Sequence, residues 1–192
     1  MQRLLVRLHR FELGTEHWRQ IDQSKVDQFI TVGETYRDLV LEKTGWDPDK
    51  VSVIGNQVDD LQLQRTKLPG ARFNIGMLGA SSSRKRLDLA FDLIEKLHEH
   101  EPRFKLHVKT ALPQDEKWVW DDEEERDYFD RELARLETDP LLDLVTFDRF
   151  GPDVADWFRK IGFILSVSDD ESFHLAPAEG MASGTVPVVR NW

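Results

Sequence analysis

The sequence predicts an α/β protein built on a doubly wound parallel sheet, for three reasons. Short apolar segments with the pattern of strands alternate with longer amphipathic segments, about four and a half times along the chain. The segment 162–168, GFILSVS, is apolar throughout, as is typical of a strand covered on both faces. Glycine or proline punctuates most of the junctions. Such a sheet needs right-handed crossovers and binds ligands beyond the carboxyl ends of its strands.

The composition excludes several classes of protein. The chain has 192 residues, of which 40% are hydrophobic, so one sizeable core is expected and the length allows one or two domains. Cysteine is absent, which excludes disulfides, thiol catalysis and thiolate metal sites. The formal net charge of −10 argues against a broad nucleic-acid surface. No apolar run approaches the roughly 20 residues of a membrane span.

The first third of the chain predicts two strands, a helix and a linker. Residues 28–33 and 51–55 have the pattern of short strands, and residues 34–45 that of a helix ending at a glycine. The expected buried face of this helix consists of Tyr36, Leu39 and Val40. Residues 56–70 are polar, are expected to be irregular, and form our candidate linker.

The rest of the chain alternates regularly. The predicted strands are residues 72–79, 103–110, 142–147, 162–168 and 185–189. The predicted helices are residues 81–100, 120–137, 152–160 and a segment from near Ala176 through Met181. Serines at the start of the first of these helices suit capping, so we expect it to begin there.

The loop GASSSRKR, residues 79–86, has the composition of an anion site. Gly79 allows a tight turn, and serine hydroxyls with free helix amides suit a phosphate or diphosphate. Arg84 and Lys85 add positive charge where the helix dipole disfavours it, so their placement needs a reason. The alternative is a capped helix with solvated basic residues. The loop matches no standard nucleotide fingerprint.

Two further loops follow predicted strands. In residues 108–113, Lys109 is expected to be solvated rather than bound to phosphate. In residues 166–175, Glu171 precedes a helix whose first turn is expected to hold Glu179. These two carboxylates suit a general acid and base, or acceptors for sugar hydroxyls. The alternatives are helix capping for Glu179 and a solvated loop acid for Glu171.

The stretch ESFHLAPAEGMASGTVPVV, residues 171–189, resembles the signature E-G-F-G-L-x-x-x-E-A-M-A-x-G-x-P-V-V of family-4 retaining glycosyltransferases of the GT-B fold. Glu171 and Glu179 have its E-x7-E spacing. The other coincident residues are Phe173, Leu175, Met181, Ala182, Gly184, Pro187, Val188 and Val189. The stretch VSVIGNQVD also resembles the family's V-x-V-I-P-N-G-V-D, and the resemblance covers nearly the whole chain.

The resemblance implies a Rossmann-like GT-B domain that is incomplete at both ends. Residues 1–55 would be the tail of the N-terminal domain, 56–70 the interdomain linker, and 71–192 a truncated C-terminal domain that binds a nucleotide sugar. On this view the chain is a fragment, and little or no transferase activity is expected of it alone.

The resemblance also implies roles for individual residues. Glu171 and His9 would be catalytic, and Glu179 would bind the ribose. The residues expected to hold the donor diphosphate are Gly79, Arg84 and Lys85. Those expected to meet the donor sugar are Glu171, Ser172, Phe173, His174 and Leu175. The family uses no cofactor and no bound metal, so the basic loop would stabilise the leaving diphosphate.

The sequence also departs from the family pattern. Ala80 stands where the family often has arginine, and Arg86, Ser172 and His174 stand where it has glycine. Gln57 replaces the glycine of N-G-V-D.

The expected function is transfer of a sugar from a nucleotide-diphosphate sugar, with retention, to a carbohydrate or lipid-linked acceptor in cell-envelope or exopolysaccharide synthesis. No nucleic acid and no transmembrane segment are expected. The expected location is the cytoplasm. For the full-length protein, peripheral association with the inner face of the membrane is an alternative. The alternatives are a GT-B nucleotide-sugar epimerase and a non-catalytic module that binds nucleotides or proteins. The group His9, Glu12, Glu16 and His17 is a weak candidate for a metal site.

Overall fold

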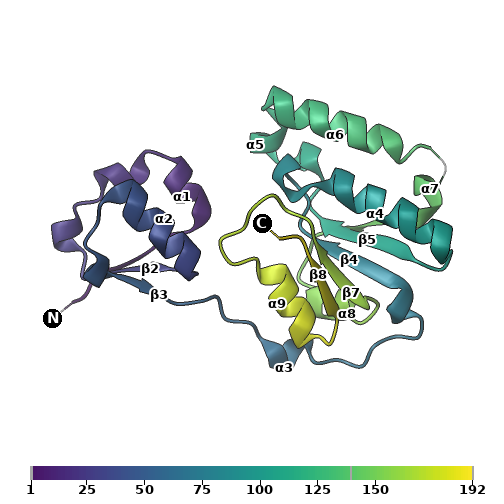
Figure 1. Cartoon of the computed structure of the whole chain (residues 1–192), viewed down its shortest axis with the longest axis horizontal. Coiled ribbons are helices and arrows are strands. Elements are labelled where there is room, and N and C mark those ends of the chain that lie inside the picture. Colours follow the sequence, from purple (N-terminus) through teal and green to yellow (C-terminus); the bar gives the residue numbers. More distant parts are fainter. Residues whose placement is uncertain (1, 139, 192) are drawn as a thin grey trace. The chain divides into compact units, whose positions relative to one another are not determined.

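The computed structural model describes residues 2–138 and 140–191, and the chain forms two compact units (Figure 1). The first unit comprises Met1–Gln57 together with the short segment Glu171–His174. The second comprises Val58–Asp170 and Leu175–Trp192. Both units are built on parallel strands.

The first unit has a three-stranded parallel sheet in the order β1-β2-β3. Its strands are β1 (Leu5–Arg7), β2 (Gln28–Thr31) and β3 (Val51–Val53), and its helices are α1 (Arg10–Gly14) and α2 (Glu34–Thr44). As predicted, α2 ends at Gly45, whose φ of 66° is left-handed. Tyr36 and Val40 are buried, but Leu39 is 47% exposed and was wrongly placed in the core. A sheet of three strands covers only a narrow stripe of the helix, which the i and i+4 side chains fill.

The segment expected to be an irregular linker instead contains a short helix, α3 (Asp60–Leu63), that packs on the second unit. Leu63 lies in an apolar cluster with Phe158 of α8 (Val154–Phe158). The Lys67 ammonium donates to the carbonyl oxygens of Phe158 (2.8 Å) and Ile161 (2.9 Å). Burial lowers the pKa of Lys67 to about 8. The region that follows residue 58 is therefore fastened to the second unit by apolar packing and by buried hydrogen bonds.

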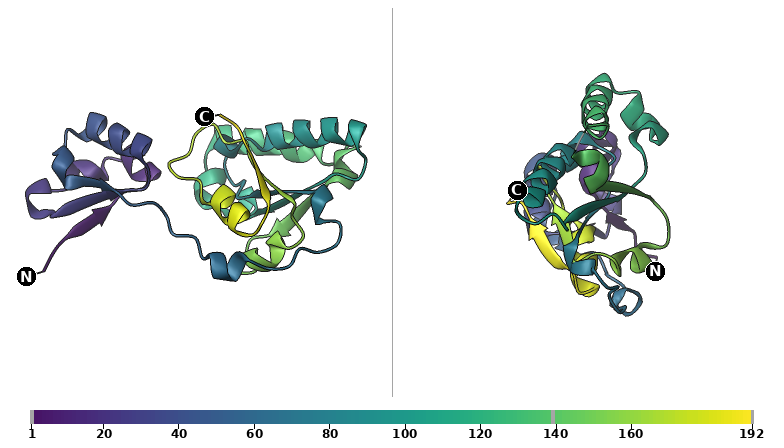
Figure 2. Two further views of the ribbon diagram at one scale, coloured as in Figure 1. Left: turned by 60° about the horizontal axis from the view of Figure 1, so that its bottom comes forward. Right: turned by 90° about the vertical axis from the view of Figure 1, so that its right-hand side faces the viewer.

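The second unit has a five-stranded parallel sheet in the order β6-β5-β4-β7-β8. Its strands are β4 (Asn74–Leu78), β5 (Lys105–Thr110), β6 (Val145–Arg149), β7 (Phe163–Ser166) and β8 (Val186–Val189). Its remaining helices are α4 (Leu87–His100), α5 (Lys117–Trp120), α6 (Glu123–Arg135), α7 (Leu141–Leu144) and α9 (Leu175–Ala182). Helices cover both faces of the sheet, with α4 and α6 on one face and α8 and α9 on the other (Figures 1 and 2). The predicted α/β class with a doubly wound parallel sheet is confirmed.

The strand order fixes where a ligand would bind. Strands β4 and β7 are neighbours, but the chain leaves β4 toward β5 and leaves β7 toward β8, on opposite sides. A sheet of this kind opens a crevice at the carboxyl ends of the two strands where the winding reverses. The loop after β4, residues 79–86, and the start of the loop after β7 therefore lie at the expected ligand edge.

Helix α9 lies very close to β7 because Gly180 has no side chain. A Cβ atom at this position would lie 2.5 Å from Cγ2 of Ile164 and 2.6 Å from Oγ1 of Thr185, both buried residues. Only glycine at position 180 therefore allows α9 to pack this closely on β7. None of the described helices is long and apolar enough to cross a membrane.

Candidate functional site

The loop after β4 is tied to the end of β5 by two hydrogen bonds. Gly79 turns the chain with a φ of 79°, and its amide donates to the carbonyl oxygen of Lys109 at 2.9 Å. The amide of the buried Ala80 donates to Oγ1 of Thr110, also at 2.9 Å. The start of the candidate anion loop is thus fixed relative to the sheet, as a preorganised binding loop requires.

The basic residues of this loop precede the helix rather than forming its first turn, which corrects the sequence prediction. Residues Ser83–Lys85 form a single 3-10 turn, Arg86 is left-handed, and α4 begins only at Leu87. The reason is a competing partner for the serine: both the amide and the hydroxyl of Ser83 donate to the carboxylate of Glu125, each at 2.7 Å. Glu125 on α6 therefore shapes the turn, and nothing in the sequence indicated this contact.

Acidic residues after β7 hold the same turn. Nη1 of Arg84 donates to the carbonyl oxygen of Asp170 at 2.6 Å and lies 3.6 Å from its carboxylate. The amide of Asp169 donates to the carbonyl oxygen of Arg84 at 3.0 Å. The loops that follow β4 and β7 are thus joined directly at the switch point. The Arg84 side chain is therefore tied in part to the segment that follows β7.

Helix α9 begins at Leu175, one residue before Ala176 and so close to the predicted start, but Glu179 lies in its second turn rather than its first. The expected capping contact is absent: among the described residues, its carboxylate has no hydrogen bond or ion pair. Burial raises the pKa of Glu179 above its ordinary value. A half-buried carboxylate without a donor is costly, which favours a ligand that brings hydroxyl donors to it.

Stability should therefore depend on the titration of Glu179. Because its folded pKa is raised, the native state binds more protons than the unfolded chain, and stability is lost as the pH rises from about 4.5 through the folded pKa. We expect Glu179→Gln to remove this loss, so that the variant gains stability over the wild type across that window. Urea unfolding from pH 4 to pH 8 measures the difference. Parallel curves for the two proteins over the whole range would contradict the assignment.

The predicted donor-sugar residues from Glu171 to His174 form the short segment assigned to the first unit. Within it, Nε2 of His174 lies 3.9 Å from Oε1 of Glu171, and the side chains are only 7% and 10% exposed. His174 has a φ of 56°, a left-handed conformation, at a position where the resembled family has glycine. Phe173 packs against the apolar core of this unit, so within the segment its ring has a packing role.

His9 precedes α1 in the first unit. Its amide donates to Glu12 at 2.7 Å, its carbonyl oxygen accepts from the hydroxyl of Tyr36, and its imidazole remains 51% exposed. The weak metal hypothesis for His9, Glu12, Glu16 and His17 finds no support, since the residues that the structure describes hold no cluster of three metal-ligating side chains.

Lys109 is not a solvated lysine, which corrects the prediction for the second loop. The side chain is almost fully buried, and its ammonium donates to Asp153 and to the carbonyl oxygen of Arg149, both at 2.8 Å. The residue alternates with Val108 along β5 and therefore points to the opposite face of the sheet, where the loop before α8 supplies Asp153. Lys109 is thus a structural cation beneath the ligand edge.

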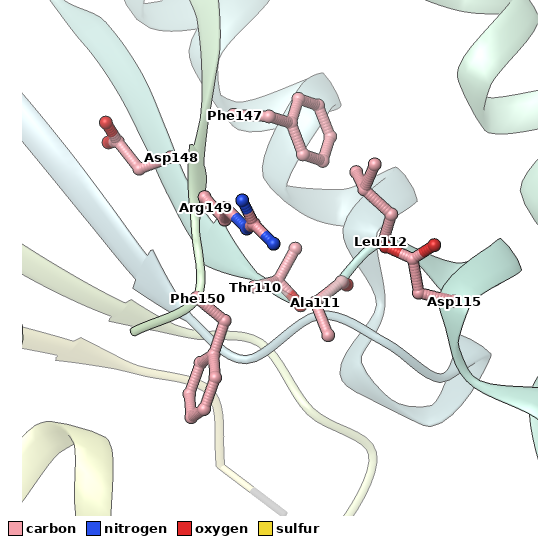
Figure 3. Close-up of a pocket in the computed structure, with 8 residues that line it drawn as sticks. All are labelled: Thr110, Ala111, Leu112, Asp115, Phe147, Asp148, Arg149 and Phe150. Atoms are coloured by element: carbon pink, nitrogen blue, oxygen red, sulfur yellow. Dashed lines mark hydrogen bonds between the residues drawn. The ribbon is translucent and has the colours of Figure 1, made fainter. Parts of the chain in front are cut away.

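A cavity of about 530 Å³ opens at the carboxyl ends of β5 and β6 (Figure 3). Its lining residues are Thr110, Ala111, Leu112, Asp115, Phe147, Asp148, Arg149 and Phe150. Figure 3 shows the guanidinium of Arg149 directed toward Thr110 and Leu112, while the Asp148 carboxylate points away on the other side of the strand. No hydrogen bond or ion pair joins the Arg149 side chain to another described residue. A planar, polar group that stacks on aromatic rings and accepts from arginine fits this composition.

This cavity was not predicted from the sequence, although ligands of a parallel sheet are expected beyond the carboxyl ends of its strands. The candidate loops in the sequence were those that follow β4, β5 and β7. The loop after β6, where Phe150 follows Arg149 at the strand end, was not among them. The missing signal was an aromatic and a basic residue directly before Gly151 at a strand end. Four loops, not three, therefore meet the ligand edge of the second unit.

The two units, with parallel strands and flanking helices, match the α/β architecture of GT-B glycosyltransferases. No family model matches the sequence, and a search of the curated proteins found no match. The comparison with solved structures therefore shows the fold alone.

Three of the similar structures illustrate this likeness. Anabaena HepE, solved with UDP and glucose, has a TM-score of 0.70 at 18% identity over 98% of this chain and 52% of that one. Staphylococcus aureus TarM, solved with fondaparinux, α-GlcNAc-glycerol and UDP, has a TM-score of 0.72 at 16% identity over 97% of this chain and 36% of that one. The pneumococcal O-GlcNAc transferase GtfA, solved with UDP and GlcNAc, gives 0.66 at 16% over 98% and 37%. The chain thus spans between about a third and about half of the length of these proteins.

Proposed function

We propose that this chain contains the donor-binding part of a glycosyltransferase that moves a sugar from a nucleotide-diphosphate sugar to an acceptor, with retention of configuration. The observation that supports this most is the half-buried, unpartnered carboxylate of Glu179 on the helix that follows the switch-point strand. A ribose offers two neighbouring hydroxyl donors to such a carboxylate. The three similar structures described above were solved with UDP, and two of them also with glucose or GlcNAc.

The diphosphate is assigned to the loop that begins at Gly79. Its turn presents Arg84 and Lys85 at the carboxyl edge of the sheet, fixed by Glu125 from one side and by Asp169 and Asp170 from the other. In a reaction that breaks the bond between sugar and diphosphate, negative charge develops on the leaving phosphate oxygens. Fixed cations at those oxygens stabilise that charge with no metal among the residues assigned here.

The base of the nucleotide is assigned to the cavity between the ends of β5 and β6. Phe147 and Phe150 supply aromatic surface, and the Arg149 guanidinium supplies donors for carbonyl oxygens of a base. Thr110 lines this cavity, and its hydroxyl oxygen also accepts a hydrogen bond from the amide of Ala80 in the diphosphate loop. One residue at the end of β5 thus links the two proposed subsites.

The donor sugar is assigned to the segment from Glu171 through Leu175, with Glu171 as its carboxylate ligand and the backbone as its other contact. His9, in the first unit, is the second residue that we propose to be catalytic. The acceptor would be a carbohydrate or a lipid-linked glycan of the cell envelope or an exopolysaccharide, at the inner face of the membrane.

The test is a calorimetric titration of the chain with UDP, GDP and ADP, with the corresponding monophosphates and with the glucose conjugates of the diphosphates. We expect one nucleoside diphosphate to bind at a 1:1 ratio and more tightly than the corresponding monophosphate, because the basic loop is assigned to the second phosphate. Equal affinity for the monophosphate and the diphosphate would contradict the assignment of Arg84 and Lys85. Failure of all three diphosphates to bind would contradict the proposed function itself.

A further inference from the structure

Arg86 occupies a backbone conformation that disfavours any residue with a Cβ atom. Its φ of 57° and ψ of 55° are left-handed, and His174 is the only other non-glycine residue with a positive φ in the described parts of the chain. The resembled family has glycine at this position, which adopts the conformation freely. A side chain retained at such a cost needs compensating contacts.

Those contacts are ion pairs with two different elements. Nε and Nη2 of Arg86 donate to the carboxylate of Asp88 in the first turn of α4, at 3.0 and 2.7 Å. Nη1 donates to Oδ1 of Asp169 after β7, at 2.9 Å. The planar guanidinium is thus used on two edges at once, which a lysine does not reproduce.

Both carboxylates are themselves fixed. The hydroxyl of Tyr128 on α6 donates to Asp88 at 2.8 Å, and the amide of Asp88 donates back to that hydroxyl at 3.0 Å. Asp169 also accepts from Nη1 of Arg190, which follows β8, at 2.6 Å. Arg86 therefore stands at the centre of a chain of contacts that runs from α6 to the end of β8.

The ion pair with Asp169 closes a ring around the basic turn. The Asp169 amide already donates to the carbonyl oxygen of Arg84, two residues before Arg86. The side chain of Arg86 makes a second connection between the same two segments, parallel to this backbone bond. Lys85 lies between these two attachment points, so its backbone is held from both sides.

We propose that Arg86 is a positioning residue that locks the turn of Arg84 and Lys85 to the Asp169–Asp170 segment and so preorganises the diphosphate site. This inference rests on the proposed function for its ligand. A glycine at this position would leave the turn free to move. Arg86, with its left-handed backbone and its ion pairs to Asp88 and Asp169, holds the turn in one conformation.

The decisive variant is Arg86→Gly, because glycine removes both ion pairs and keeps the left-handed backbone without strain. We expect a midpoint of urea unfolding close to that of the wild type. Without ligand, amide hydrogen exchange of residues 82–86 and of Asp169 should accelerate, and the affinity for UDP should fall by about tenfold. Arg86→Lys keeps one charged donor group. Its hydrogen exchange and its affinity for UDP should therefore lie between those of Arg86→Gly and those of the wild type.

A matched control is Arg103→Gly, since Arg103 makes a comparable two-pronged pair with Glu101 beyond the other end of α4, at 2.8 and 2.6 Å. We expect it to change neither the exchange of residues 82–86 nor UDP binding. Wild-type exchange in Arg86→Gly would overturn the proposal, and so would accelerated exchange with unchanged UDP affinity. If the wild type bound none of UDP, GDP and ADP, the proposed function would be overturned instead. The hydrogen exchange is measured without ligand, so it tests the contacts of Arg86 separately from the proposed function.

Discussion

Replacing Lys85 with alanine is expected to weaken binding of a nucleoside diphosphate by about tenfold to a hundredfold. A charged donor that meets a phosphate contributes roughly 1.5–3 kcal/mol, and each 1.4 kcal/mol is about a factor of ten in affinity. Lys85 lies in the turn that Glu125 and the Asp169–Asp170 segment fix, so its position is set before the ligand arrives. Calorimetric titration of wild type and variant with the same diphosphate measures the change.

A second lysine in the same unit supplies the control. Lys96 is exposed on α4, so Lys96→Ala removes the same formal charge outside the ligand edge. We expect the affinity of this variant to stay within about a factor of two of the wild type, because salt largely screens an exposed charge that does not touch the ligand. An equal loss in both variants would mean that net charge, rather than the position of Lys85, governs binding.

Replacing Phe158 with alanine is expected to lower the free energy of unfolding of the second unit by about 3–5 kcal/mol. The ring is fully buried, packs edge to face on Trp157 at 5.1 Å, and shares its apolar cluster with Leu63 of α3. The cavity left by the ring would also remove the surface on which α3 packs. Proteolysis near residues 64–68 should therefore become faster, because this segment depends on the same cluster.

A control variant is available on α3 itself. Leu61 is 84% exposed, so Leu61→Ala should change the free energy of unfolding by less than about 0.5 kcal/mol. Urea titrations that follow amide signals of β4 and β7 report the second unit separately. If Phe158→Ala destabilised the second unit without exposing residues 64–68 to protease, the packing assigned to α3 would be wrong.

Hydrophobic pattern was sufficient for the fold class and for most strands. The continuous apolar run of β7 and the amphipathic stripe of α4 both lie where they were expected, because burial on one face or on both leaves a periodic trace in sequence. Short elements without such a trace were missed, among them β1, whose three residues are mostly exposed, and α3, whose burial rests on Leu63.

The errors at the site arose from partners that lie far away in sequence. Serines before α4 looked like caps, but Glu125 on a different helix takes the Ser83 donors. Lys109 looked like a solvated strand end, but Asp153 from another loop pairs with it in the interior. A single sequence gives no signal for such tertiary hydrogen bonds, whereas the departures from glycine at Arg86 and His174 were visible and acquired a meaning only with their left-handed φ angles.

The measurement that tests the central claim most directly is an amide-resolved NMR titration of the chain with whichever of UDP, GDP and ADP it binds, compared with the corresponding monophosphate. If the second unit binds a nucleoside diphosphate as proposed, signals of residues 79–86 should shift with the diphosphate far more than with the monophosphate. Signals near Ala111 and Phe150 should shift with both, because the base is assigned to that cavity. Shifts confined to other parts of the chain, or equal responses of residues 79–86 to both ligands, would contradict the account.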